Sequence, residues 1–276
     1  MNNNFIKVCT MIIGLLMCIS CASERAEVTY RPNNNCQVEM PVYHPTPAEI
    51  EKDNIFSLVA YAVVFKGWQQ SRSVGRGYNI GSVLVDENYN IVCWARNAVN
   101  VAKNNTQHGE VRLMLNYLHN CRNVFSLPKY RLYTTLEPCA MCSGMMTLNE
   151  LFITVYGQKD HGYGDAIQRL ALDSSSCGGF KPYPRPVISV VNQTDLPGML
   201  DEAYVNSGIQ RISEWLATDK AKGIFKHANR ELYDYKPKYP ENIPILRSAL
   251  DFLQAVPNNF AGFFYEVNCS NCPGAN

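Results

Sequence analysis

The sequence predicts an α/β protein with a mixed β-sheet, and two observations carry that prediction. Two β-branched runs, 78–86 and 91–95, are separated by the short polar segment 87–90, which is typical of a β-hairpin. Further on, the apolar runs 151–157 and 187–191 flank a segment with helical spacing. A strand–helix–strand connection implies parallel pairing, so both kinds of pairing are expected in one sheet.

Length and composition allow one domain with elaborations. The 276 residues are 46% hydrophobic, which is ample for a full core. Removing residues 1–22 takes one basic residue, Lys7, from the 25 in the chain and leaves 24 against 24 acidic residues. A chain without net charge lacks the global basic character expected of a strong polyanion binder.

Residues 1–22 have the pattern of a targeting segment. Lys7 precedes the apolar run 8–19, which is too short to span a bilayer, and small residues up to Ala22 suit cleavage. We therefore expect a signal peptide over 1–22, an exported chain and no membrane span in its mature part. The alternatives are lipid anchoring through Cys21, whose preceding residues match the usual small-residue box poorly, and an uncleaved N-terminal anchor.

The next segments are an arm and a helix. Residues 23–47 are polar and interrupted by prolines, so an extended N-terminal arm is expected there. Pro47 suits the first turn of a helix, and apolar side chains recur at helical spacing up to about Gln70. The apolar face of this helix is expected to pack on the sheet.

A second helix is predicted from Glu110 to Asn120, after the polar loop 96–107 that follows the hairpin. His108 stands just before this helix and two residues before Glu110. A histidine can bind a metal ion, and a nearby carboxylate can move protons beside that ion without binding it.

A short strand, 131–135, leads to the segment that carries the cysteines. Cys139 and Cys142 are three residues apart, so both sulfurs lie on one face if Pro138 opens a helix. A helix N-terminus lowers a thiol's pKa, and the thiolate binds metal. With His108 as the third ligand, a catalytic zinc site would keep its fourth position for water.

Each part of this pattern has a simpler reading. Cys139 and Cys142 could form a disulfide or be buried thiols, and His108 could be a core histidine. The ordered combination H-x-E and P-C-x-x-C in a helix-opening context favours zinc over these readings.

The chain resembles the zinc-dependent cytidine deaminase-like superfamily, whose signature is this H-x-E and P-C-x-x-C combination. The run LYTTLEPCAMCSGMM is most similar to the tRNA adenosine deaminase and guanine deaminase branch, and the resemblance covers roughly residues 50–191. One departure is Gly109, where the middle residue of H-x-E is commonly Ala or Pro. We do not expect this glycine to inactivate the site.

The resemblance implies a three-layer α/β/α fold with a mixed five-stranded sheet, as a deaminase domain over 48–195. It implies one Zn²⁺ held by His108, Cys139 and Cys142. Substrate contacts at Asn97 and Asp160 are also implied, although a turn role is as plausible for Asn97 and is favoured for Asp160. Related deaminases often form dimers or tetramers, so a homo-oligomer is the default expectation.

The expected reaction is hydrolytic deamination of a nucleobase in a free base, a nucleoside or a nucleic acid. Zinc-bound water attacks the carbon that bears the exocyclic amine, and Glu110 carries its proton to a ring nitrogen and then to ammonia. The main alternative is an exported binding module whose zinc is structural. The presence of Glu110 argues against that alternative, since a structural site gains little from it.

Beyond Val191 the resemblance fades, and we expect a mostly helical C-terminal extension over 196–276. Apolar spacing predicts amphipathic helices at 200–216 and 242–255. Residues 205–250 hold eight basic and five acidic residues with tyrosines among them. Such a mixture can bind single-stranded nucleic acid, but an ordinary solvated surface is the favoured reading.

The cysteines suit an oxidising compartment. Of 11 cysteines, three fall in residues 1–22, and two more are the candidate zinc ligands, which leaves six, enough for three disulfides. Their pairing does not follow from the spacing. For Cys269 and Cys272 a disulfide is favoured over a metal half-site, because no second pair accompanies them.

Overall fold

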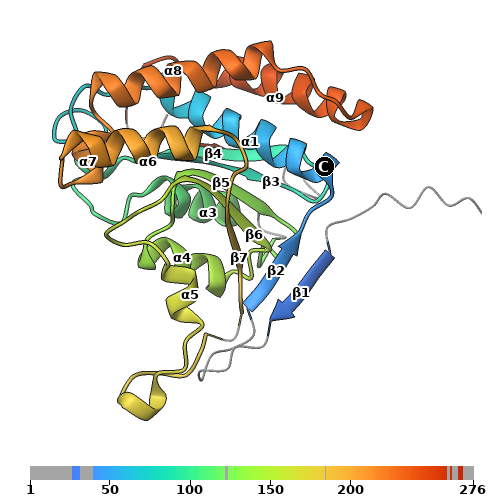
Figure 1. Ribbon diagram of the computed structural model, residues 1–276, viewed down its shortest axis with the longest axis vertical. Coiled ribbons are helices and arrows are strands. Elements are labelled where there is room, and N and C mark those ends of the chain that lie inside the picture. The colour runs from blue at the N-terminus through green and yellow to red at the C-terminus, as the bar shows by residue number, and fades with distance from the viewer. Residues whose placement is uncertain are drawn as a thin grey trace, which may run out of the picture.

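A mixed β-sheet with helices on both faces forms the centre of the molecule (Figure 1). The structure, a computed structural model, describes residues 27–31, 40–121, 124–183, 185–259, 262 and 267–269. The sheet order is β7-β6-β5-β3-β4-β8. The three-layer α/β/α prediction is confirmed, but the sheet has six strands rather than five.

The pairing of the strands follows the sequence patterns. Strands β3 and β4 form the antiparallel hairpin, and β5 and β6 pair in parallel, as do β6 and β7. The parallel ending predicted from the strand–helix–strand connection is therefore confirmed. The strands of this sheet are β3 (Gly81–Val85), β4 (Ile91–Arg96), β5 (Arg131–Leu136), β6 (Ile153–Gln158), β7 (Ile188–Val191) and β8 (Val267–Cys269).

The sixth strand, β8, was not predicted. It contributes three residues and pairs antiparallel with β4, so that Cys269 lies opposite Cys93. A disulfide joins these two cysteines. The expectation of a disulfide rather than a metal half-site is therefore confirmed for Cys269, whose partner lies on the neighbouring strand of the sheet. Cys272 lies outside the described residues.

Helix α1 (Pro47–Lys66) packs on one face of the sheet, as predicted. Thr46 and Glu49 form a capping box at its start. The helix ends at Lys66 rather than near Gln70. Gly67 follows it and lies so close to the guanidinium of Arg96 that a Cβ would clash.

Helices α8 (Asp219–Asp234) and α9 (Ile243–Ala255) pack on the outer side of α1, and α6 (Leu196–Ser207) packs on β6 (Figure 1). All the C-terminal helices share one hydrophobic core with α1. The predicted helix 200–216 is two helices, because Gly208 adopts a left-handed conformation with φ 68° and ends the first. Helix α8 was not predicted, since its segment was interpreted by its charges. These helices are α6 (Leu196–Ser207), α7 (Ile212–Trp215), α8 (Asp219–Asp234) and α9 (Ile243–Ala255).

The opposite face of the sheet carries the helices of the metal centre. Helices α3 (Gly109–Asn120) and α4 (Ala140–Leu148) pack there against a second hydrophobic core. The short helix α2 (Val99–Ala102) interrupts the loop expected over 96–107, and α5 (Ala166–Leu170) follows β6.

The arm predicted over residues 23–47 folds back on itself where it is described. Strands β1 (Glu27–Arg31) and β2 (Met40–His44) form an antiparallel pair. Tyr43 attaches this pair to the core, because its hydroxyl donates to Asp53 at 2.8 Å and accepts from Arg131 at 2.8 Å. Among the described residues, no helix is long and apolar enough to cross a membrane.

Candidate metal centre

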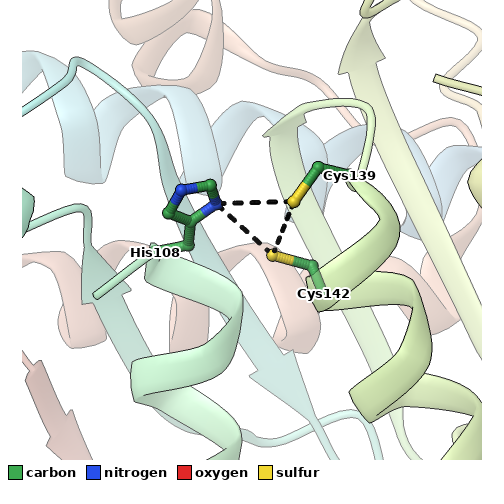
Figure 2. Close-up of side chains that lie close together, drawn as sticks. All are labelled: His108, Cys139 and Cys142. Carbon is green, nitrogen blue, oxygen red and sulfur yellow. Dashed lines mark hydrogen bonds between the residues drawn. The ribbon is translucent and has the colours of Figure 1, made fainter. Parts of the chain in front are cut away.

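Two helix N-termini bring the predicted metal ligands together at one edge of the sheet. His108 is the N-cap residue of α3, and Cys139 is the N-cap residue of α4, with Cys142 in the first turn behind it. Figure 2 shows these three side chains pointing toward one another from the two helices. They are the one group in the described part of the chain whose ligand atoms lie within 4.8 Å of one another.

The spacing of the three ligand atoms is that of a tetrahedral zinc site. The two sulfurs are 3.7 Å apart, and the Nδ1 atom of His108 lies 3.7 Å from Cys139 and 3.6 Å from Cys142. Zn–S bonds of about 2.3 Å and a Zn–N bond of about 2.0 Å at tetrahedral angles separate sulfurs by about 3.8 Å and sulfur from nitrogen by about 3.5 Å. The donor set and its geometry therefore fit one Zn²⁺.

The environment of the thiols favours metal binding. The hydrogen bond with Cys142, and to a lesser extent that with His108, lowers the pKa of Cys139 to about 4. The thiolate is the form that binds metal. Cys139 and Cys142 are free thiols, so the disulfide reading of this pair is wrong.

Glu110 lies beside the ligands on α3 and is not one of them. Its side chain is 3% exposed, and its Oε2 atom has no hydrogen-bond partner in the part of the chain that the structure describes. Burial raises the pKa of this carboxyl group. A buried carboxylate oxygen without a hydrogen-bond partner costs free energy in a folded protein. This cost indicates that a bound molecule donates a hydrogen bond to the oxygen when the site is in use.

The family profile for the cytidine and deoxycytidylate deaminase zinc-binding region matches residues 59–157. A probable cytosine deaminase from Schizosaccharomyces pombe is 37% identical over 143 residues, which are 50% of this chain and 81% of that protein. The chain belongs to this deaminase family.

Two further similarities are partial. A tRNA-specific adenosine deaminase from Haemophilus influenzae is 35% identical over 85 residues, which are 31% of this chain. The match spans about half of that protein, 49% of its length. A solved structure from a study of tRNA:A34 deaminases is 25% identical and covers 41% of this chain and 83% of its own, with a TM-score of 0.33. That structural overlap is too low to support a function.

Gly109, the departure from the deaminase signature, is explained by close packing. A Cβ at this position would lie 3.1 Å from the carbonyl oxygen of Ala95 and 3.3 Å from the Cα of Gly81. Both neighbours are backbone atoms of sheet strands and cannot move aside easily. Glycine therefore lets the start of α3 lie against β3 and β4 with His108 and Glu110 on either side.

Asn97 is fully buried at the end of β4, and only half of its amide is used. Its Oδ1 atom accepts from the backbone N–H groups of Tyr78 at 3.0 Å and Val99 at 3.3 Å. Its Nδ2 atom has no partner among the described residues. The carbonyl half has the turn role considered from sequence, and the NH₂ half can still donate to another molecule.

Asp160 has the turn role that the sequence favoured. Its Oδ1 atom accepts from the backbone N–H groups of Gly162 and Tyr163, each at 3.0 Å. Its own backbone N–H donates to Glu137, a residue that sequence reasoning left without a role. The only sequence signal for Glu137 was its place directly before Pro138 in the second motif.

Proposed function

We propose that this chain is a zinc-dependent hydrolytic deaminase that removes the exocyclic amine of a nucleobase as ammonia. The observation that carries this proposal is the unpartnered carboxylate oxygen of Glu110, buried beside three side chains spaced for zinc. A site that only stabilised the fold would leave this buried acceptor without a purpose. The structural-zinc alternative therefore has less support.

The side chains divide the work between binding metal and moving protons. His108, Cys139 and Cys142 would hold the zinc ion, which when bound supplies an activated water as nucleophile. Glu110 would take a proton from the attacking water and deliver it to a ring nitrogen of the base. It would then protonate the departing amine, which leaves as ammonia. Its burial suits this role, because a carboxyl group with a raised pKa is a stronger base and can hold the proton until it is delivered.

Asn97 would orient the substrate. Its free Nδ2 atom is a donor held in place by the two hydrogen bonds to its Oδ1 atom. It would bind an acceptor atom on the base or its sugar, since satisfying a buried donor recovers the cost of leaving it unpaired. Asp160 would act on the substrate through the turn that it stabilises and not by direct contact.

The substrate class is a nucleobase with an exocyclic amine, as a free base, a nucleoside or part of a nucleic acid. The relatives with adenosine and cytosine deaminase names support this breadth. Ammonia release from separate substrates identifies the base.

We also propose that the protein is exported and self-associates. The Cys93–Cys269 disulfide supports export, because disulfides persist mainly in oxidising compartments. Mass spectrometry of the protein recovered outside the cytoplasm should give an N-terminus at Ser23, and an intact Met1 would contradict cleavage. The homo-oligomer stays a prediction from the resemblance, for sedimentation to measure.

The test of the enzymatic proposal is ammonia release by the zinc-loaded protein and by Glu110→Gln. Free bases, nucleosides, tRNA and single-stranded DNA are offered separately. We expect the wild type to release ammonia from one class, and we expect Glu110→Gln to lose at least a hundredfold in rate, as for removal of a general acid–base group. Both proteins should bind one zinc and unfold at similar temperatures.

Glu87→Gln is the matched control, because Glu87 is an exposed residue that pairs with Lys129 on the surface. It should keep full activity. Wild-type protein that binds one zinc but releases no ammonia from any substrate would reject the enzyme and favour the binding module.

A further inference from the structure

The loop over residues 160–165 is fixed beside the metal ligands by the topology of the sheet. Strands β5 and β6 are parallel, so their carboxyl ends lie at the same edge, with Leu136 opposite Gln158. Cys139 follows β5 and the loop follows β6 within a few residues of that edge. The loop therefore lies at the same edge of the sheet as the metal centre, and open α/β sheets bind their ligands at the carboxyl ends of the strands.

Glu137 binds this loop with both oxygens of its carboxylate. Its Oε2 atom accepts from the backbone N–H of Asp160 at 3.1 Å, and its Oε1 atom accepts from the backbone N–H of Asp165 at 2.8 Å. The side chain is 3% exposed, so its carboxylate is buried, and the bond to Asp160 is buried with it. One side chain thus holds both ends of the loop.

Gly164 allows the carboxylate to come this close. A Cβ on Gly164 would clash with the Oε2 atom of Glu137 and would lie 2.5 Å from the carbonyl oxygen of Asp160. The backbone N–H of Gly164 also donates to that carbonyl oxygen at 2.8 Å. A larger residue at 164 would push the loop away from Glu137.

Helix α6 holds the outer side of the same loop. The ring of His161 stacks on Tyr204 with centroids 5.9 Å apart, and its Nε2 atom lies 3.6 Å from a carboxylate oxygen of Asp201. The Tyr163 side chain, in contrast, is 73% exposed. The loop is thus held from both sides with Tyr163 free to meet another molecule.

We propose that Glu137 is a positioning residue, which fixes the 160–165 loop as a wall of the substrate pocket two residues before the ligand Cys139. This inference rests on the proposed deaminase function. Glu137 acts on substrate binding through the loop and touches neither the metal nor the reacting atoms.

Glu137→Gln tests this role with three measurements on the full chain. Glutamine puts an NH₂ group against a backbone N–H, so one of the two hydrogen bonds becomes a repulsion. We expect the amides of Asp160 and Asp165 to exchange hydrogen at least about tenfold faster, since a lost hydrogen bond to a charged group is worth at least that factor. Zinc content should stay at one per chain, and KM should rise about tenfold with a smaller change in kcat.

Gly164→Ala disturbs the same contact between Glu137 and the loop, because the added methyl group would clash with the carboxylate. It should give the same pattern, and the double variant should be little worse than either single variant, because both remove one interaction. Glu150→Gln is the control, since Glu150 pairs with Arg185 on the surface. It should leave the exchange of both amides and KM unchanged.

Three results would overturn the inference. These are unchanged exchange at both amides, loss of zinc in Glu137→Gln, and an unchanged KM in an active variant. Failure of the wild type to release ammonia would instead remove the proposed function, and this inference with it. The wild-type assay therefore distinguishes a failure of the proposed function from a failure of the role proposed for Glu137.

Discussion

Gly109 stands between the two residues that carry the proposed chemistry, and its missing side chain decides how close α3 comes to the sheet. The nearest atoms are the backbone of Ala95 and Gly81, at 3.1 and 3.3 Å from an added Cβ. Because these atoms belong to strands paired on both sides, any shift must be taken by α3. A shift of α3 displaces His108 and Glu110 together.

Gly109→Ala should therefore lower the free energy of unfolding by about 1 kcal/mol. Crowding against fixed backbone costs about 1–3 kcal/mol, and the better helix propensity of alanine returns at most about 1 kcal/mol. Chemical denaturation of the zinc-loaded protein measures the difference. Gly144→Ala, on α4 with open space around its Cα, should be stabilising. An equal gain at Gly109 would show that the strands yield.

Among single residues, the sequence predicted those whose partners are close in sequence or are ligands of the same metal ion. The spacing of Cys139 and Cys142 and the place of His108 were sufficient to predict a zinc site, and the structure brings these residues together. The role of Glu137 was not predicted, because its carboxylate accepts from backbone N–H groups 23 and 28 residues away. Backbone groups are the same in every residue, so the sequence does not mark them.

Helix α8 makes the C-terminal helices part of the main core. Its buried face packs on α1, where Phe225 meets the rings of Tyr61 and Trp68 at centroid distances of 5.0 and 5.2 Å. Removing these helices would expose the outer face of α1, which is buried along most of its length. The deaminase fold of this chain therefore depends on them.

Phe225→Ala should lower the free energy of unfolding by about 3–5 kcal/mol, as for other buried aromatic truncations. Tyr233→Ala on the same helix is the control, because Tyr233 is 54% exposed, and it should change stability by less than about 0.5 kcal/mol. Thermal and urea unfolding measure both variants. Similar losses in the two would mean that α8 does not contribute to the core as described.

Elements with a continuous apolar pattern were predicted, and those defined by distant contacts were not. Helix α1 and strands β3 to β7 follow hydrophobic spacing that is legible in sequence. Helix α8 was not predicted, because its many charged residues obscure the apolar stripe of residues 221, 224, 225, 228 and 232. Strand β8 is too short to show any period, and only its pairing with β4 defines it.

In the part of the chain that the structure describes, two hydrophobic cores lie on opposite faces of one sheet, and a disulfide joins its edge strand to the next strand. The Cys93–Cys269 disulfide links residues 176 positions apart and lies under α3, with both sulfurs within 4 Å of the carbonyl oxygen of Leu113. It thus ties the last described strand to β4, beneath the helix that begins at the metal centre.

Cys93→Ser with Cys269→Ser should destabilise the protein by roughly 2–5 kcal/mol, because the unfolded chain loses a long covalent loop. Urea unfolding under oxidising conditions measures this loss. The wild type in reducing agent should lose a similar amount, plus the contribution of the disulfide at Cys121. A double variant as stable as the wild type would show that the bond is absent or irrelevant in solution.

The position of β8 also sets an order of events during synthesis. Strand β4 is made early, but its outer edge pairs with a strand 176 residues further along the chain, as measured between the two cysteines. At roughly 5–20 residues per second the ribosome needs roughly 9–35 s to supply it. During that interval β4 offers an open edge to other chains, which is a known route to aggregation. A nascent chain of this kind is a candidate for chaperone protection until its final strand arrives.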